Sequence, residues 1–187
     1  MNLQELRTIP NLLTATRGLL LPVLWTEALR GDRLVVGIGL AVCFWLDFGD
    51  GFVARKLGQT SAFGSRFDSI VDGFVGPSAI AWLLLLEPDA LLDHKLLAVT
   101  WFVITYVSLA VGLFKFRRFA NLHLQSSRIA CVFQYAFLVD AFVAPPALSA
   151  LLYVAGGLGI LSSLETLVIQ VFRDRVHERM RSILVLR

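Results

Sequence analysis

Two pairs of aspartates lie among strongly apolar residues between positions 47 and 72. Asp47 and Asp50 are three residues apart, and Asp68 and Asp72 are four residues apart. On helices, residues at these spacings share one face, so each pair presents two carboxylates from one helix. Because only a short connection joins the pairs, we expect the two helices to be antiparallel neighbours and the four carboxylates to converge.

Four converging carboxylates would repel one another, and divalent cations remove this repulsion. Oxygen-only ligands suit hard ions such as Mg²⁺ or Mn²⁺. Two such ions about 4 Å apart commonly hold the attacking and leaving oxygens in a displacement at phosphorus. The alternative is that the aspartates only form salt bridges at the membrane interface, with Arg55, Lys56 and Arg66 as partners. The spacing of the four acids favours the metal site.

The residues between the two acid pairs predict a ligand with phosphate groups. Gly51 and Ala54 follow Asp50 on adjoining helical turns and remove side-chain bulk beside the carboxylates. Arg55 offers a planar fork of donors that matches phosphate oxygens. Gly64 allows the connecting loop to turn back before the second pair.

The composition predicts that these residues lie in a membrane protein. Of the 187 residues, 57% are hydrophobic and only 17% are charged, whereas about a quarter of a soluble domain is charged. Six apolar stretches have roughly the 20 residues that a bilayer-spanning helix needs. We therefore predict an all-α integral membrane protein, one domain over 1–187, with six transmembrane helices near residues 11–30, 34–54, 66–86, 96–114, 129–145 and 147–172.

The basic residues predict how these helices cross the membrane. Of the 17 lysines and arginines, only three lie at the connections that come directly after the first and third apolar stretches: Arg30, Arg33 and Lys95. We place the other 14, including Arg17 within the first stretch, on the opposite side. Basic residues concentrate on the cytoplasmic side of membrane proteins. Both termini and the two acid pairs are therefore expected on the cytoplasmic side.

The acidic stretch as a whole resembles the signature of the CDP-alcohol phosphatidyltransferase family. It reads Asp-x2-Asp-Gly-x2-Ala-Arg-x8-Gly-x3-Asp-x3-Asp from Asp47 to Asp72 and matches the signature at all eight fixed positions. The resemblance implies an enzyme of phospholipid biosynthesis. Such an enzyme transfers the phosphatidyl group of a CDP-linked lipid, usually CDP-diacylglycerol, to an alcohol and releases CMP.

The resemblance also implies roles for individual residues. Asp47, Asp50, Asp68 and Asp72 would hold two divalent cations, Mg²⁺ or Mn²⁺, and Asp72 would also take the proton of the attacking hydroxyl. The residues implied to contact the CDP-lipid are Gly51, Ala54, Arg55, Ser61, Gly64, Asn11 and Thr14. The last two belong to "PNLLTATR", which is similar to the start of family members, and helix capping is the alternative role for Asn11.

The resemblance further implies a homodimer in the bacterial cell (inner) membrane with its active site facing the cytoplasm. The expected partners are the CDP-linked lipid, the alcohol acceptor and membrane lipids, and we expect no nucleic acid. Two functions of other classes stay open beside the enzyme: a divalent-cation transporter and a non-catalytic membrane protein that use the aspartates as a cation site. The position of all four acids at one interface and the intact motif favour the enzyme.

The acceptor alcohol is not predicted by the sequence. A phosphorylated acceptor would need further cations, for which Lys115 and Arg128 are candidates, with membrane anchoring as the alternative. The start "IPNLLTATRGLLLP" is similar to phosphatidylglycerophosphate synthases. Those enzymes usually carry a lysine after the last aspartate, where this chain has Gly73, and this departure argues against glycerol phosphate.

Overall fold

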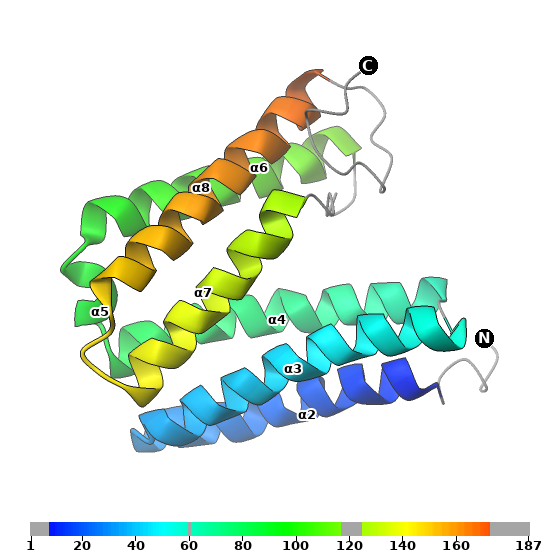
Figure 1. The fold of residues 1–187 in the computed structure, drawn as a ribbon, viewed down its shortest axis with the longest axis horizontal. Helices are drawn as coiled ribbons and strands as arrows, with labels where there is room; N and C mark the ends of the chain where they lie inside the picture. Colours follow the sequence, from blue (N-terminus) through cyan, green and yellow to red (C-terminus); the bar gives the residue numbers. More distant parts are fainter. Residues whose placement is uncertain (1–7, 60, 117–124, 173–187) are drawn as a thin grey trace. The chain divides into compact units, whose positions relative to one another are not determined.

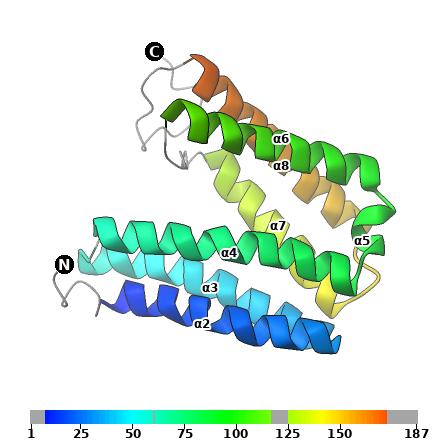
Figure 2. The ribbon, with the colours of Figure 1, turned by 180° about the vertical axis from the view of Figure 1, so that it is seen from behind.

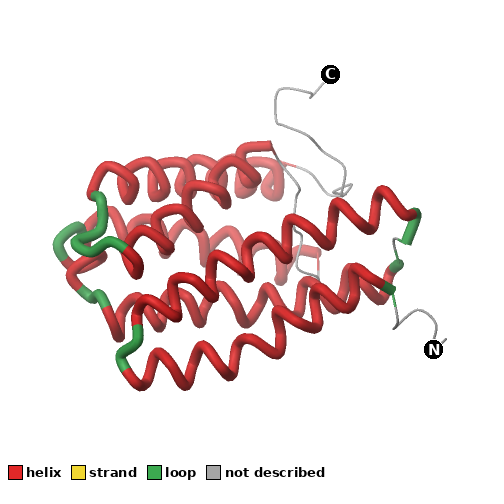
Figure 3. The backbone as a smooth tube through the Cα atoms, turned by 60° about the horizontal axis from the view of Figure 1, so that its bottom comes forward, coloured by secondary structure: helices red, strands yellow, loops and turns green. Residues whose placement is uncertain are grey.

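The computed structural model describes residues 8–59, 61–116 and 125–172. Within these ranges the chain forms helices joined by short loops, with no strand (Figure 3). The helices, in chain order, are α2 (Ile9–Arg30), α3 (Arg33–Leu57), α4 (Ala62–Leu86), α5 (Asp89–Leu92), α6 (Lys95–Phe116), α7 (Gln125–Val143) and α8 (Ser149–Phe172) (Figure 1). All six predicted stretches are helical. The short α5 was not predicted, because its four residues are too few to show a pattern.

Caps and glycines set the ends of the helices that carry the acids. The Ser61 hydroxyl accepts a hydrogen bond of 2.9 Å from Gly64 N and caps the start of α4. Gly58, in the left-handed conformation with φ 63°, ends α3. As a result α4 begins about one turn before the predicted position, and α3 continues to Leu57. The aspartates therefore lie inside the helices, away from their ends.

Within the described residues, five helical segments are long and apolar enough to cross a membrane: Arg33–Leu57, Phe63–Leu86, Lys95–Gly112, Ser126–Val143 and Ser149–Phe172. Large apolar side chains are exposed along the helices, for example Leu19, Leu96 and Phe114, with 75%, 81% and 88% of their surface accessible. Exposed apolar surface on long helices fits an integral membrane protein. The 22-residue α2 is outside this set, and the polar residues Thr14, Arg17 and Glu27 interrupt its apolar sequence.

The chain divides into two compact units, and the first contains the acids. It comprises α2, α3 and α4 together with Leu138–Pro145 at the end of α7. The helices α2, α3 and α4 run alongside one another (Figure 2). α2 packs against both α3 and α4, whereas α3 and α4 touch each other only sparingly. At one end of this unit Trp25 of α2 packs edge-to-face on Trp82 of α4, with ring centroids 5.7 Å apart. α2 is thus the helix that holds the other two together.

The second unit contains α5, α6, α8 and residues up to Phe137 of α7. The small residues of "YVAGGLGILSS" in α8 allow close packing of its helices. A Cβ atom added at Gly156 of α8 would lie only 3.3 Å from Leu97 of α6. Hydroxyl groups also join these helices, since Thr105 Oγ1 and Ser163 Oγ are 3.0 Å apart.

Candidate active site

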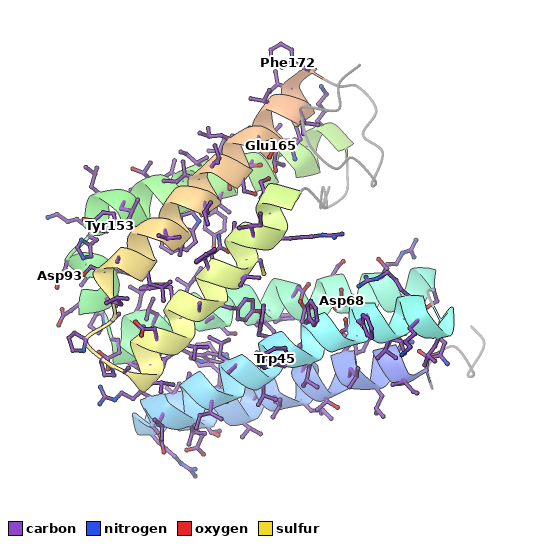
Figure 4. The ribbon with its side chains drawn as sticks, in the orientation of Figure 1. Trp45, Asp68, Asp93, Tyr153, Glu165 and Phe172 are labelled. Atoms are coloured by element: carbon purple, nitrogen blue, oxygen red, sulfur yellow. The ribbon has the colours of Figure 1, made fainter. Side chains whose placement is uncertain are left out.

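The two acid pairs meet in the first unit. Asp47 and Asp50 come from α3, and Asp68, which is labelled in Figure 4, comes from α4 with Asp72. Asp47, Asp50 and Asp68 each offer a carboxylate oxygen, and these three atoms lie within 4.8 Å of one another. Asp72 is linked to these three acids through the side chain of Arg17, with which all four form ion pairs. The structure therefore brings together all four carboxylates that the spacing singled out.

The guanidinium of Arg17, on α2, contacts acids of both neighbouring helices. Its Nη1 is paired with Asp47 of α3. Its Nη2 lies 2.6 Å from Asp68 Oδ1, 3.1 Å from Asp72 Oδ1 and 4.0 Å from Asp50 Oδ2. The Arg17 side chain has no exposed surface, and its Nε is buried without a hydrogen-bond partner in the described part of the chain. One arginine therefore joins all three helices at the acids.

Arg17 is the residue that the sequence analysis missed. It was counted among the basic residues that orient the chain, and Arg55, Lys56 and Arg66 were named as the possible partners of the acids. The structure shows these three side chains exposed, and the ion pairs run to Arg17. A signal was present in the sequence: Asn11, Thr14 and Arg17 follow one another at three-residue intervals, which places them on one face of α2. All three are buried.

Thr14 and Asn11 lie beside the acids and the loop. Thr14 Oγ1 is 3.0 Å from Asp50 Oδ2 and 3.2 Å from Pro10 O, and its single hydrogen serves these two acceptors. Asn11 does not cap α2, because the helix begins at Ile9 with Thr8 at the N-cap position. The capping alternative for Asn11 was therefore wrong. Its Oδ1 instead lies where a side chain at Gly64 would go, 2.7 Å from an added Cβ.

The other residues predicted to contact the CDP-lipid lie in the C-terminal part of α3 and at the start of α4. The Arg55 side chain folds back along α3, so that a Cβ added at Gly51 would lie 3.3 Å from Arg55 Nη1. The missing side chain of Gly51 therefore makes room for the guanidinium. Ala54 lies in the last turn of α3, and Ser61 caps α4. Contact of these residues with a lipid stays a prediction.

The donor set of the acid cluster fits divalent cations. All four ligand side chains are carboxylates, and hard ions such as Mg²⁺ prefer oxygen. Arg17 offsets one of the four negative charges, which leaves excess negative charge for bound cations to balance. The four acids differ in exposure: the Asp72 side chain is 45% accessible, Asp47 33% and Asp68 36%, whereas Asp50 is only 8% accessible. The cluster thus has a buried side, at Arg17, and an exposed side.

The two predicted acceptor residues belong to the second unit. Lys115 Nζ donates to the carbonyl oxygens of Gln170 at 2.9 Å and Val171 at 3.1 Å, at the end of α8. A cation at this position stabilises the last turn of a helix, a structural role that was not predicted. Arg128 is exposed on α7. Their contact with an acceptor stays a prediction.

Comparison with known proteins gives two matches that cover this site. The family model for CDP-alcohol phosphatidyltransferase matches residues 7–172. The chain is similar to the CDP-diacylglycerol–glycerol-3-phosphate 3-phosphatidyltransferase of Rickettsia felis (strain ATCC VR-1525 / URRWXCal2). The two are 29% identical over 159 residues, which make up 83% of this chain and 80% of the relative. No solved structure matches the chain significantly.

Proposed function

The chain belongs to the CDP-alcohol phosphatidyltransferase family, and from this membership we propose that it transfers the phosphatidyl group of CDP-diacylglycerol to an alcohol. It is an enzyme of phospholipid synthesis. The observation that carries the proposed reaction is the convergence of four carboxylates from α3 and α4. An acid cluster of this kind suits the binding of a diphosphate through divalent cations.

In the proposed mechanism the four aspartates have two kinds of role. Asp47, Asp50 and Asp68, whose oxygens lie within 4.8 Å of one another, and Asp72 hold two divalent cations, Mg²⁺ or Mn²⁺. When bound, these ions neutralise the diphosphate and stabilise the leaving CMP. Asp72, the most exposed of the four, takes the proton of the acceptor hydroxyl. The hydroxyl oxygen then bonds to the phosphorus of the phosphatidyl group as the bond from this phosphorus to CMP breaks.

The CDP portion is proposed to lie over the exposed side of the cluster. Arg55, at the end of α3, binds phosphate oxygens with its planar fork. The other contacts implied by the family resemblance are Gly51, Ala54, Ser61 and Gly64, together with Asn11 and Thr14. Asn11 and Thr14 are buried with Arg17, so their contact with the CDP portion stays a prediction of the resemblance alone.

We propose six membrane spans, with α2 as the first. Its 22 residues are long enough to cross a bilayer. Its interrupting arginine is buried against carboxylates within the first unit, as charges in membrane helices usually are. With both termini cytoplasmic, the acids face the cytoplasm from the inner membrane. A homodimer stays a prediction, and mass measurement of the purified protein in detergent would test it.

For the acceptor we propose glycerol 3-phosphate, because the Rickettsia felis relative is named for it. A phosphorylated acceptor also agrees with the proposal that the basic residues Arg128 and Lys115 bind the acceptor. Gly73, which stands where phosphatidylglycerophosphate synthases usually have lysine, argues the other way. The choice therefore depends on direct comparison of acceptors.

The test is an assay of the purified protein with CDP-diacylglycerol, Mg²⁺ or Mn²⁺, and one acceptor at a time: glycerol 3-phosphate, serine or inositol phosphate. CMP release and the lipid product are measured together. We expect CMP only with an acceptor, loss of CMP release in excess chelator, and recovery when the cation is restored. Asp47→Asn should abolish the activity, whereas Asp93→Asn, an exposed aspartate of the second unit, should leave it unchanged. Cation flux across vesicles without CMP release would instead indicate a transporter.

A further inference from the structure

We propose that Arg17 is a positioning residue that joins the acid pairs of α3 and α4 into a single divalent-cation site. This inference rests on the proposed function, because it concerns the site at which the cations would bind. It adds a residue outside the acidic motif and assigns to α2 a part in building the site.

α3 and α4 contribute little to holding each other in place. The two helices touch sparingly, and both pack on α2. The distance between the acid pairs is therefore set through α2. Near the acids, the side chain of α2 that contacts both helices by ion pairs is Arg17, with Asp47 on one side and Asp68 and Asp72 on the other.

The shape of the guanidinium suits it to bridging two helices. Its planar fork lets two nitrogens bind different carboxylates at once. In this structure Nη1 is paired with Asp47 and Nη2 with Asp68 at 2.6 Å, so one rigid group bridges α3 and α4. A lysine at position 17 would supply the same charge at a single point, without the fork.

Arg17 lies on the buried side of the acid cluster. The Arg17 side chain is wholly buried, whereas the side chains of Asp47, Asp68 and Asp72 are 33%, 36% and 45% accessible. Arg17 thus holds the carboxylates from their buried side. The exposed side of the carboxylates stays accessible to cations and substrate. Arg17 can therefore position the carboxylates while cations bind to them.

The direction of the effect separates positioning from simple charge. A positive charge beside a cation site repels cations, so that removing it should strengthen their binding. If Arg17 positions the acids, removing it should weaken binding. The two roles therefore predict opposite changes for Arg17→Gln.

The experiment is a titration of the purified full-length protein in detergent with Mn²⁺ alone, followed by electron paramagnetic resonance. For the parent protein we expect two tightly bound, magnetically coupled ions. For Arg17→Gln we expect at least a tenfold rise in the Mn²⁺ dissociation constant and loss of the coupling. Arg17→Lys should lie between the two, because it keeps the charge and lacks the fork.

The matched control is Arg33→Gln, which removes another ion pair of the first unit. Arg33 Nη1 is 2.8 Å from Glu87 Oε1, and Arg33 lies about 21 Å along α3 from Asp47 by helical rise. This variant should bind Mn²⁺ like the parent. Thermal unfolding of each variant checks that it is folded, and Arg17→Lys serves if Arg17→Gln is not.

Each result has a distinct meaning. Unchanged or tighter Mn²⁺ binding in a folded Arg17→Gln, with binding lost in Asp47→Asn, would overturn the role of Arg17 and leave the proposed metal site intact. If the parent protein binds no Mn²⁺, the proposed metal site is wrong, and the inference about Arg17 is wrong with it.

Discussion

Thr14→Val tests whether the hydroxyl beside Asp50 orients this carboxylate. Thr14 Oγ1 lies 3.0 Å from Asp50 Oδ2, and both residues are buried, with 2% and 6% of their surface accessible. Valine keeps the branched shape of threonine and removes the donor. Because Asp50 is nearly inaccessible, water cannot readily replace the lost hydrogen bond.

The magnitude follows from the kind of bond. A hydrogen bond to a charged group contributes about 1.5–3 kcal/mol. Residues that orient metal ligands typically change metal affinity by roughly 10–100-fold when they are replaced, and this range corresponds to about 1.4–2.7 kcal/mol. The two values agree. We therefore expect Thr14→Val to raise the dissociation constant of Mg²⁺ or Mn²⁺ by about one to two orders of magnitude.

Titration calorimetry with Mn²⁺ and the CMP-release assay measure this effect on binding and on turnover. Thr14→Ser is the control, because it keeps the hydroxyl and removes only a methyl group. It should stay close to the parent protein. Parent-like Mn²⁺ affinity in a folded Thr14→Val would show that the hydroxyl does not orient a ligand. An equal loss in Thr14→Ser would show that packing of the methyl group is responsible.

Three further substitutions test other parts of the site. Asp72→Asn should lower turnover by roughly 10²–10⁴ while CDP-lipid binding with Mg²⁺ largely survives, and near-parent turnover at saturating Mg²⁺ would refute its role as base. Gly64→Ala should lower the free energy of unfolding by about 1–3 kcal/mol, since its Cβ would lie 2.7 Å from Asn11 Oδ1 and 3.1 Å from the capping Ser61 Oγ. Its control is Gly76→Ala, where a Cβ would meet nothing within 4 Å; equal thermal unfolding of the two would contradict the reasoning. Arg128→Ala should raise the KM for glycerol 3-phosphate by about tenfold or more, as expected for a lost charged hydrogen bond, with CDP-lipid binding unchanged; an unchanged KM would return Arg128 to membrane anchoring.

The sequence predicted the helices well because long apolar runs have few other solutions in a bilayer. Their ends were predicted less well. The start of α4 depends on the Ser61 hydroxyl reaching Gly64 N, and the end of α3 on the left-handed Gly58. Both are local interactions that a pattern of hydrophobicity does not record. The same applies to α5, a short turn of helix between two spans.

The four aspartates of the site could be predicted from the sequence, but the arginine that lies among them, Arg17, could not. Spacing along one helix shows which side chains share a face, and this was sufficient for each acid pair. Spacing does not show which other helix packs against that face. The basic residue Arg17 was therefore assigned by its position along the chain, as an orienting charge. Its burial against α3 and α4 depends on α2 packing on both.

In the proposed six-span arrangement, the buried arginine makes membrane insertion of α2 depend on the chain synthesised after it. An arginine at the centre of a spanning helix disfavours insertion by about 2.5–3.5 kcal/mol, and α2 leaves the ribosome before the segments that carry Asp47, Asp68 and Asp72, the partners of Arg17, have emerged. We expect α2 to wait at the membrane surface until α3 and α4 arrive. A cysteine at Leu19, in a Cys43→Ala background, should react with a water-soluble thiol reagent in a chain that ends after Leu57 and has been released from the ribosome. It should be protected in one that extends through Leu86, and equal protection would mean that α2 inserts unaided. The order of synthesis and the order of insertion would then differ, and the aspartates of the proposed metal site would also be the partners that bring the first helix into the bilayer.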